Sequence, residues 1–289
     1  MEACLSHPIY DPVRPALMRL AREPDWPDCA RLNALARELG TPARTASGKP
    51  VRFTSPPQDD ANYELRVHAS GAIATRANNW HDLFNALAWL AFPRVKATLN
   101  ARHAARIPHE RGQRSPLRDL LTIFDEGGAI VGVSEPSLVE LIRGFRWREL
   151  FWTRRADVLR ALRFVIVGHA VLEQARSPWP GITCKALFVP VDAALLDAPS
   201  ERLLAHLDER AALWFAAARD DCTPRALAPL PVFGYPGWFP GNDREGFYAD
   251  ARYFRPLRRA AVKYVRESAR QPLCASAEES PGSIERDAG

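Results

Sequence analysis

The fold of this chain is decided by residues 75–103, which read TRANNWHDLFNALAWLAFPRVKATLNARH. The segment from Asp82 to Phe92 is apolar on nearly every face, which is typical of a helix buried on all sides. Pro93 suits the first turn of a following helix, because proline lacks the N–H that an interior position must donate. We therefore predict two consecutive helices that meet at Pro93, the first of them capped by Asn78 or Asn79.

One turn at the start of the first helix carries His81, Asp82 and Asn85. His81 and Asn85 are four residues apart, so they share a face of the helix. An imidazole, a carboxylate and an amide presented together can bind a divalent metal or relay a proton. These three residues are therefore the candidate catalytic set of a hydrolase-like enzyme. The alternative is structural, because Asp82 in the first turn also favours the helix dipole.

The second helix presents Lys96, Asn100 and His103 on one stripe, at positions i, i+4 and i+7. If the chain turns at Pro93, this stripe can face His81 across a shared hollow. Lys96 and Asn100 would then help to hold a phosphate or a carboxylate. We treat the three as candidate binding residues. A solvated face of an amphipathic helix is the other interpretation.

Residues 50–75 read as β-structure, with a turn at Ser70-Gly71 in YELRVHASGAIATR. A hairpin followed by a helix is the order found in metal-dependent nucleases of the His-metal-finger type. In that hypothesis His68 would be the base on a strand, and His81 and Asn85 would be metal ligands. The acidic-His pair expected on the first strand is missing, so this is the weaker enzyme hypothesis.

A second pair of functional side chains lies in RFVIVGHAVLEQA, where His169 and Glu173 are four residues apart. Such a pair can bind a metal or act as a general base, but the second histidine of a zincin motif is absent. A buried and mutually satisfied pair is the preferred interpretation. Gly168 costs helix propensity at this point and indicates close packing.

Residues 223–256 are rich in proline, glycine and aromatic side chains and predict a long ordered loop that wraps the body. Trp238 and Asn242 would lie at the mouth of a pocket for a small polar ligand. The alternative function is therefore a non-catalytic ligand- or partner-binding protein that uses residues 235–250. A scaffold loop whose aromatic residues cover the core is an equally good reading.

The remaining pattern predicts a mostly helical α+β domain with small antiparallel β-hairpins. LLTIFDEGGAIVGV is expected to form one hairpin, with its turn at Glu126-Gly127-Gly128. A helical region should run from Ser134 to about Gln174, a strand should cover 181–191, and a helix should cover 200–219. We expect one domain over residues 1–266 and a disordered tail over 267–289.

Composition narrows the functional classes. The net charge is +5, but only four of the 39 basic residues are lysine, and the basic residues alternate with acidic ones. Nucleic-acid binding is therefore disfavoured, though not excluded. Five cysteines without CxxC spacing fit neither a zinc site nor a disulfide framework, which favours a reducing cytoplasm. No apolar run approaches the ~20 residues that span a bilayer, and the first residues lack a signal-peptide pattern.

Three blocks of the chain resemble a known family when taken together. They are residues 63–103, then RFVIVGHAVLEQARSPWPGITCKAL, then PLPVFGYPGWFPGNDREGFYADARYFRP. The sequences of these blocks and their order along the chain resemble those of the bacterial family called domain of unknown function 3025, over roughly residues 50–256. The resemblance implies a bacterial, soluble protein. It brings no activity, cofactor or catalytic residue with it.

Overall fold

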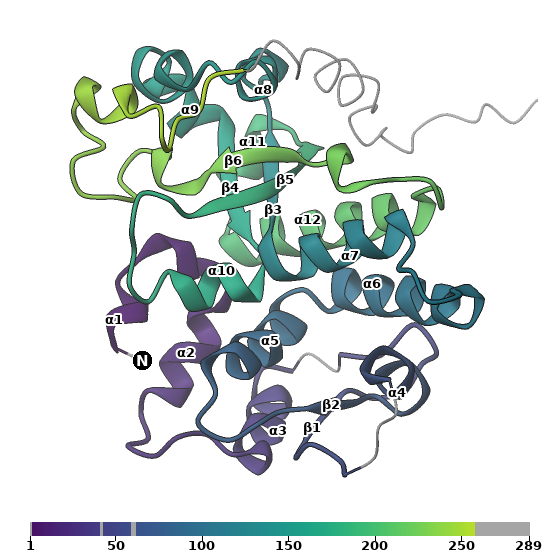
Figure 1. Ribbon diagram of the computed structural model, residues 1–289. Coiled ribbons are helices and arrows are strands. Elements are labelled where there is room, and N and C mark those ends of the chain that lie inside the picture. Colours follow the sequence, from purple (N-terminus) through teal and green to yellow (C-terminus); the bar gives the residue numbers. More distant parts are fainter. Residues whose placement is uncertain (1, 41–42, 59–61, 258–289) are drawn as a thin grey trace, which may run out of the picture.

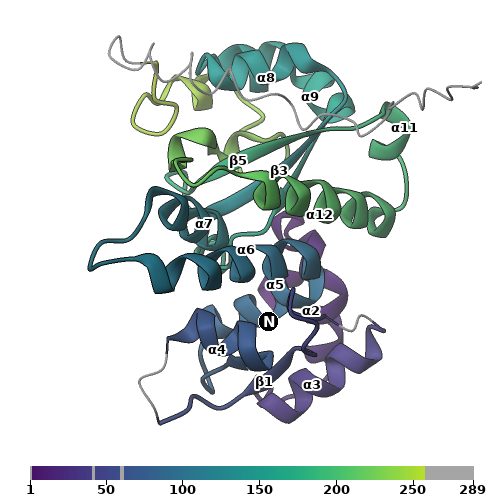
Figure 2. The same ribbon diagram turned by 90° about the vertical axis from the view of Figure 1, so that its right-hand side faces the viewer.

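The computed structural model describes residues 2–40, 43–58 and 62–257 (Figure 1). The tail expected at 267–289 lies outside these residues. Within them the chain is an α+β domain with helices in the majority, as predicted. Figures 1 and 2 show an N-terminal helical layer that lies against a second layer built on a four-stranded sheet.

The N-terminal layer combines short helices with a two-stranded sheet. The strands β1 (Arg52–Thr54) and β2 (Ala72–Ala74) pair in parallel. The helices are α1 (Glu2–Leu5), α2 (Arg14–Leu20), α3 (Cys29–Glu38) and α4 (Tyr63–Ser70), with a 3-10 helix at Pro8–Val13.

The β prediction for residues 50–75 is wrong over α4. Asn62 accepts a hydrogen bond from the Glu64 N–H at the start of this helix, and Gly71 ends it with φ of +74°. A Cβ at Gly71 would lie 2.2 Å from the Pro50 carbonyl oxygen, so only glycine fits there. A cap and a left-handed stop thus convert the alternating pattern into a helix. The helix connects β1 to β2, which explains why the two strands run parallel.

The two consecutive helices predicted on either side of Pro93 are confirmed. Helix α5 (Trp80–Ala91) begins where the Asn79 side chain accepts from the Asp82 N–H at 2.9 Å. Helix α6 (Pro93–Arg106) follows after the single non-helical residue Phe92. The first N–H groups of α6 find their acceptor in another helix, because the Arg94 and Val95 amides donate to the Asp208 carboxylate.

The main sheet has the strand order β4-β3-β5-β6. Its strands are β3 (Gly128–Val133), β4 (Leu162–Ile166), β5 (Thr183–Pro190) and β6 (Ala228–Pro231). The central pair β3 and β5 is parallel, and both outer pairs are antiparallel. The expectation of small antiparallel hairpins is therefore only half right. Long helical excursions separate the antiparallel partners along the described chain, so this sheet has no tight hairpin there.

Helices cover both faces of this sheet (Figure 2). All residues of β3 are buried, which is the pattern of a strand covered on both sides. Helices α6, α7 (Pro116–Gly127) and α12 (Ser200–Ala217) pack with Ile130 and Leu187 on one face. The other helices of this layer are α8 (Pro136–Arg143), α9 (Arg155–Ala161), α10 (His169–Gln174) and α11 (Ala193–Leu196), with a π-helical turn at Glu149–Thr153 and a 3-10 turn at Pro224–Ala226.

Two predicted boundaries in this layer are wrong. The expected hairpin around Glu126-Gly127-Gly128 is the junction of α7 with β3, because α7 is capped by Ser115 and runs without a turn into the strand. The helical region expected from Ser134 to Gln174 is interrupted by β4. The β-branched run in this strand pairs with β3, and tertiary pairing overrides helix propensity there.

The proline- and aromatic-rich segment is only partly a loop. It includes β6 and two 3-10 turns, Val232–Gly234 and Glu245–Ala249. Asn242 is 1% exposed and donates to the Phe233 and Tyr235 carbonyls. Trp238 is 7% exposed. The structure therefore corrects the expectation that these side chains line a pocket mouth, because their polar groups and surface are used to hold the segment on the core.

Among the described residues, no helix combines the length and the apolar character that crossing a bilayer requires.

Candidate metal centre

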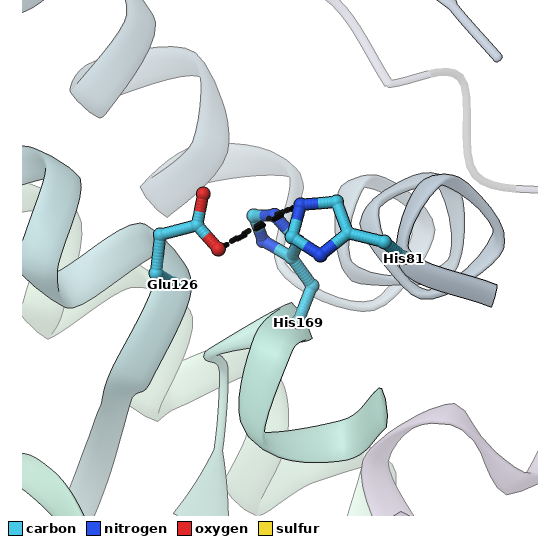
Figure 3. Close-up of side chains that lie close together, drawn as sticks. All are labelled: His81, Glu126 and His169. Carbon is cyan, nitrogen blue, oxygen red and sulfur yellow. Dashed lines mark hydrogen bonds and ion pairs between the residues drawn. The ribbon is translucent and has the colours of Figure 1, made fainter. Parts of the chain in front are cut away.

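Three side chains from different helices converge on one point (Figure 3). His81 comes from the first turn of α5, Glu126 from the last turn of α7, and His169 from the first residue of α10. His81 Nε2 lies 3.1 Å from His169 Nε2 and 3.7 Å from Glu126 Oε2. His169 Nε2 lies 3.3 Å from the same Glu126 oxygen.

The sheet places two of these residues. The α7 helix enters β3 directly, and β4 pairs with β3 so that Ala129 lies opposite Ile166. The amides of Val167 and Gly168 both donate to the Gly128 carbonyl, at 3.0 and 2.9 Å. A Cβ on Gly168 would lie 2.6 Å from the Glu126 carbonyl oxygen, so glycine permits this close approach. His169 is thereby held beside the end of α7.

The spacing of the three atoms fits a shared cation. Ligand atoms at about 2.1 Å from a tetrahedral metal lie roughly 3.4 Å apart. The three observed distances, 3.1, 3.3 and 3.7 Å, bracket this value. Two imidazoles and one carboxylate are also a common donor set for Zn²⁺ and for other divalent transition metals.

Carboxylates also face the second nitrogen of each imidazole. His81 Nδ1 lies 3.1 Å from Glu173 Oε2, which requires a proton on Nδ1 and leaves the Nε2 lone pair free to bind a metal. His169 Nδ1 is buried without a hydrogen-bond partner, and Asp125 Oδ2 lies 3.8 Å from it. A carboxylate hydrogen-bonded to the second ring nitrogen, as Glu173 is to His81, orients a metal-ligating histidine and fixes its tautomer. Asp125 is beyond hydrogen-bond distance and acts on His169 through its charge.

The electrostatics of the centre favour the ligating form of His169. Burial lowers the pKa of this imidazole to about 3, so the ring is neutral at pH 7. Burial raises the pKa of Glu126, and the charge on Asp125 adds to this effect. Burial alone would also raise the pKa of Asp125, but the Lys96 ammonium, together with His169 and His103, lowers it overall. A cation would favour the charged form of Glu126, which its surroundings otherwise penalise.

The centre is accessible to solvent from one side. The side chains of His81 and Glu126 are 34% and 42% exposed, whereas that of His169 is 4% exposed. A cation bound here would therefore have His169 behind it and open coordination positions in front. Three protein ligands with an open position are typical of catalytic rather than structural sites.

Of the predicted polar residues of α5 and α6, Asn85 and Lys96 meet directly. Lys96 is 3% exposed, forms an ion pair with Asp125, and donates to Asn85 Oδ1 at 2.9 Å. The Asn85 amide in turn donates to the Tyr63 hydroxyl at 3.2 Å. This chain of contacts connects the predicted set to the acidic end of α7.

The other two residues of the α6 stripe have partners in other helices. Asn100 donates to Glu64 Oε2 at 2.7 Å and to the Glu64 carbonyl at 2.9 Å. His103 Nδ1 accepts from Arg118 Nε at 3.1 Å. The interpretation of this stripe as a solvated face is therefore wrong, because Lys96, Asn100 and His103 are all buried.

Two predicted residues do not join the centre. Both oxygens of Asp82 are engaged by Arg76, whose guanidinium and backbone amide donate to it at 2.7 to 2.9 Å. This pairing lowers the pKa of Asp82 against the opposing effect of burial. His68 lies on α4 rather than on a strand, so the hairpin that the nuclease hypothesis requires is absent from the described chain.

Glu126 and Asp125 were missed because the sequence interpretation placed them in a turn. A helical reading of residues 116–127 was available, since Ser115 is a good cap and Leu117, Leu120, Leu121 and Phe124 recur at helical spacing. His169 and Glu173 were noted as a pair. In the structure each of them contacts His81 instead.

The fold and the site define an α+β protein in which a mixed sheet and an N-terminal helical layer together form an imidazole–carboxylate cluster. The chain belongs to the family described as Protein of unknown function (DUF3025), whose model matches residues 51–258. The matched range includes His81, Glu126 and His169. No curated protein and no solved structure matches the chain.

Proposed function

We propose that this protein is a metal-dependent hydrolase whose divalent cation is bound by His81 Nε2, His169 Nε2 and Glu126 Oε2. The observation that carries the proposal is the convergence of these three atoms to within 3.1 to 3.7 Å of one another. The carboxylates of Glu173 and Asp125, which face the opposite ring nitrogens, support it.

Hydrolysis is the chemistry that this donor set favours. A cation with three protein ligands keeps positions for water, and it lowers the pKa of that water toward 7. The exposed faces of His81 and Glu126 would let water and a substrate reach those positions. The buried His169 and the Lys96–Asp125 pair behind it would hold the ligands in place.

A cytoplasmic location is part of the same proposal. The described cysteines Cys4, Cys29, Cys184 and Cys222 are all free thiols. Free thiols are maintained most readily in a reducing compartment.

The proposal is tested by metal analysis and calorimetry on the full chain. The purified protein, treated with chelator and then dialysed, is titrated with Zn²⁺ and with Mn²⁺. We expect one equivalent to bind, and we expect His81→Ala and His169→Ala to abolish this binding. His109→Ala is the matched control, because this histidine is exposed and outside the centre. Equal binding by all four proteins, or no binding by the unmodified chain, would refute the metal centre.

Activity is then measured with p-nitrophenyl phosphate and p-nitrophenyl acetate as general hydrolase substrates. We expect turnover that a chelator removes and that the bound metal restores. Glu126→Gln should lose this turnover while the protein still melts cooperatively. Turnover that persists without metal would contradict the hydrolase assignment.

A further inference from the structure

A polar cavity of about 260 Å³ lies next to the metal centre, and Glu126 lines both. Helices α4, α6 and α7 contribute to its wall, with Tyr63, His103, Arg118 and Asp125 among the lining residues. At about 30 Å³ per water molecule, the volume corresponds to roughly nine waters. It therefore suits a small molecule or one end of a larger one.

The cavity wall carries both signs of charge. Asp125 and Glu126 join it to the metal centre, and Arg114 and Arg118 bring two guanidinium groups to it. Glu64 is a third lining carboxylate; it accepts from Asn100, and burial raises its pKa, which favours the neutral form. A substrate that reaches the cation through this cavity would therefore contact arginine with its remote part.

His103 brings a neutral donor to the same wall. Its Nδ1 accepts from Arg118 Nε at 3.1 Å, so the ring proton must be on Nε2. Burial lowers the pKa of His103 to about 4, which keeps the ring uncharged at pH 7. Nε2 has no hydrogen-bond partner among the described residues, and it is not fully buried. An N–H donor is thus available on a residue that lines the cavity.

The arginines keep donors available as well. Arg118 uses Nε on His103 and Nη1 on Glu110, and no described residue accepts from its Nη2. Arg114 is exposed, and its one hydrogen bond to a described residue is to the Thr122 hydroxyl at 3.3 Å. Guanidinium groups with free N–H pairs recognise oxyanions by paired hydrogen bonds.

We infer that this cavity binds the oxyanion group of a small substrate, a carboxylate or a phosphate, through Arg114, Arg118 and the Nε2–H of His103. The inference rests on the proposed function for the position of the reacting bond, which the cavity would direct toward Glu126 and the cation. The protein would then hydrolyse small anionic molecules rather than neutral or cationic ones.

Calorimetry on the full chain tests this inference. Inorganic phosphate and succinate are titrated separately into the metal-loaded protein and into the metal-free protein. We expect at least one of them to bind, and the tighter of the two identifies the preferred oxyanion. Because a charge-assisted hydrogen bond contributes about 1.5–3 kcal/mol, Arg114→Ala should weaken binding roughly ten- to hundredfold.

Arg111→Ala is the matched control, because Arg111 is an exposed arginine near Arg114 that does not line the cavity. It should bind like the unmodified chain. Arg118→Lys should weaken binding without removing it, since lysine keeps the charge but not the planar donor pair. Thermal melts of each variant confirm that the chain is folded before its titration is interpreted.

The outcomes separate this inference from the proposed function. If the metal-loaded protein binds the anion and neither Arg114→Ala nor Arg118→Lys changes the affinity, then the anion binds to the cation alone. That result would overturn the inference. Binding of neither anion by either form would also overturn it. Arginine-dependent binding by a chain that takes up no metal would support the cavity and refute the metal-dependent hydrolase.

Discussion

Replacing Lys96 by methionine tests how the centre is supported from behind. Lys96 is 3% exposed, its ammonium is paired with Asp125, and it also donates to Asn85. Methionine has a similar length, so the variant removes the charge and leaves little empty space. The Asp125 carboxylate, which lies beside His169, then has no ammonium group to neutralise it.

The magnitude follows from burial. Removing one partner of a buried ion pair costs about 3–5 kcal/mol, because the other charge remains desolvated. The Asp125 side chain is 23% exposed, so water recovers part of this cost and we expect roughly 3 kcal/mol. The double variant, Lys96→Met with Asp125→Asn, removes both charges. It should be about 1–2 kcal/mol more stable than Lys96→Met alone.

The assay is urea unfolding at pH 7 with a chelator present, so that bound metal does not contribute. Lys49→Met is the control, because Lys49 is exposed and should change stability by less than about 0.5 kcal/mol. A cost below about 1 kcal/mol for Lys96→Met would refute the reasoning. So would a double variant that is less stable than Lys96→Met.

Three further predictions concern single residues. Glu173→Gln should weaken Zn²⁺ binding about 10- to 100-fold in a chelator competition, because an amide orients His81 less well; unchanged affinity would contradict this role. Burial raises the pKa of Asp208 from 3.8 to about 6, so the folded chain holds this proton more tightly than the unfolded chain does. The resulting stabilisation is fully present below about pH 4 and is lost as the pH rises through 6. Asp208→Asn should remove this part of the pH dependence, which urea unfolding at pH 4 and pH 7 measures; an unchanged difference between the two would count against it. Gly71→Ala should lower the free energy of unfolding by more than about 1 kcal/mol, because alanine is strained at φ of +74° and its Cβ would meet the Pro50 carbonyl. A melting temperature equal to that of the unmodified chain would disprove this.

Local pattern was enough to predict the elements that carry their own start and stop signals. The Asn79 cap, the apolar faces of α5 and the Pro93 start of α6 are all encoded within a few residues. The Asp28 cap of α3, whose side chain accepts from the Arg31 amide, is encoded in the same local way. These predictions needed no knowledge of tertiary contacts.

The candidate metal centre could not be predicted in the same way. Glu126 and His169 meet because β3 and β4 pair across a long excursion of the chain, and no local pattern encodes that pairing. The Gly127-Gly128 junction resembles a turn in sequence and is a helix-to-strand boundary in the structure. Register between distant strands is a tertiary property, so the sequence located His81 and His169 separately but neither Glu126 nor the meeting of the three.

The three side chains of the candidate centre come from both layers of the fold. Glu126 and His169 are tied to neighbouring strands, whereas His81 stands on α5, which packs against α10 and α6. A cation bound by all three residues would cross-link the sheet to the N-terminal helices. Metal occupancy would then add to the folding free energy of the whole chain by mass action, so that a cell starved of the ion would hold less intact protein as well as less activity.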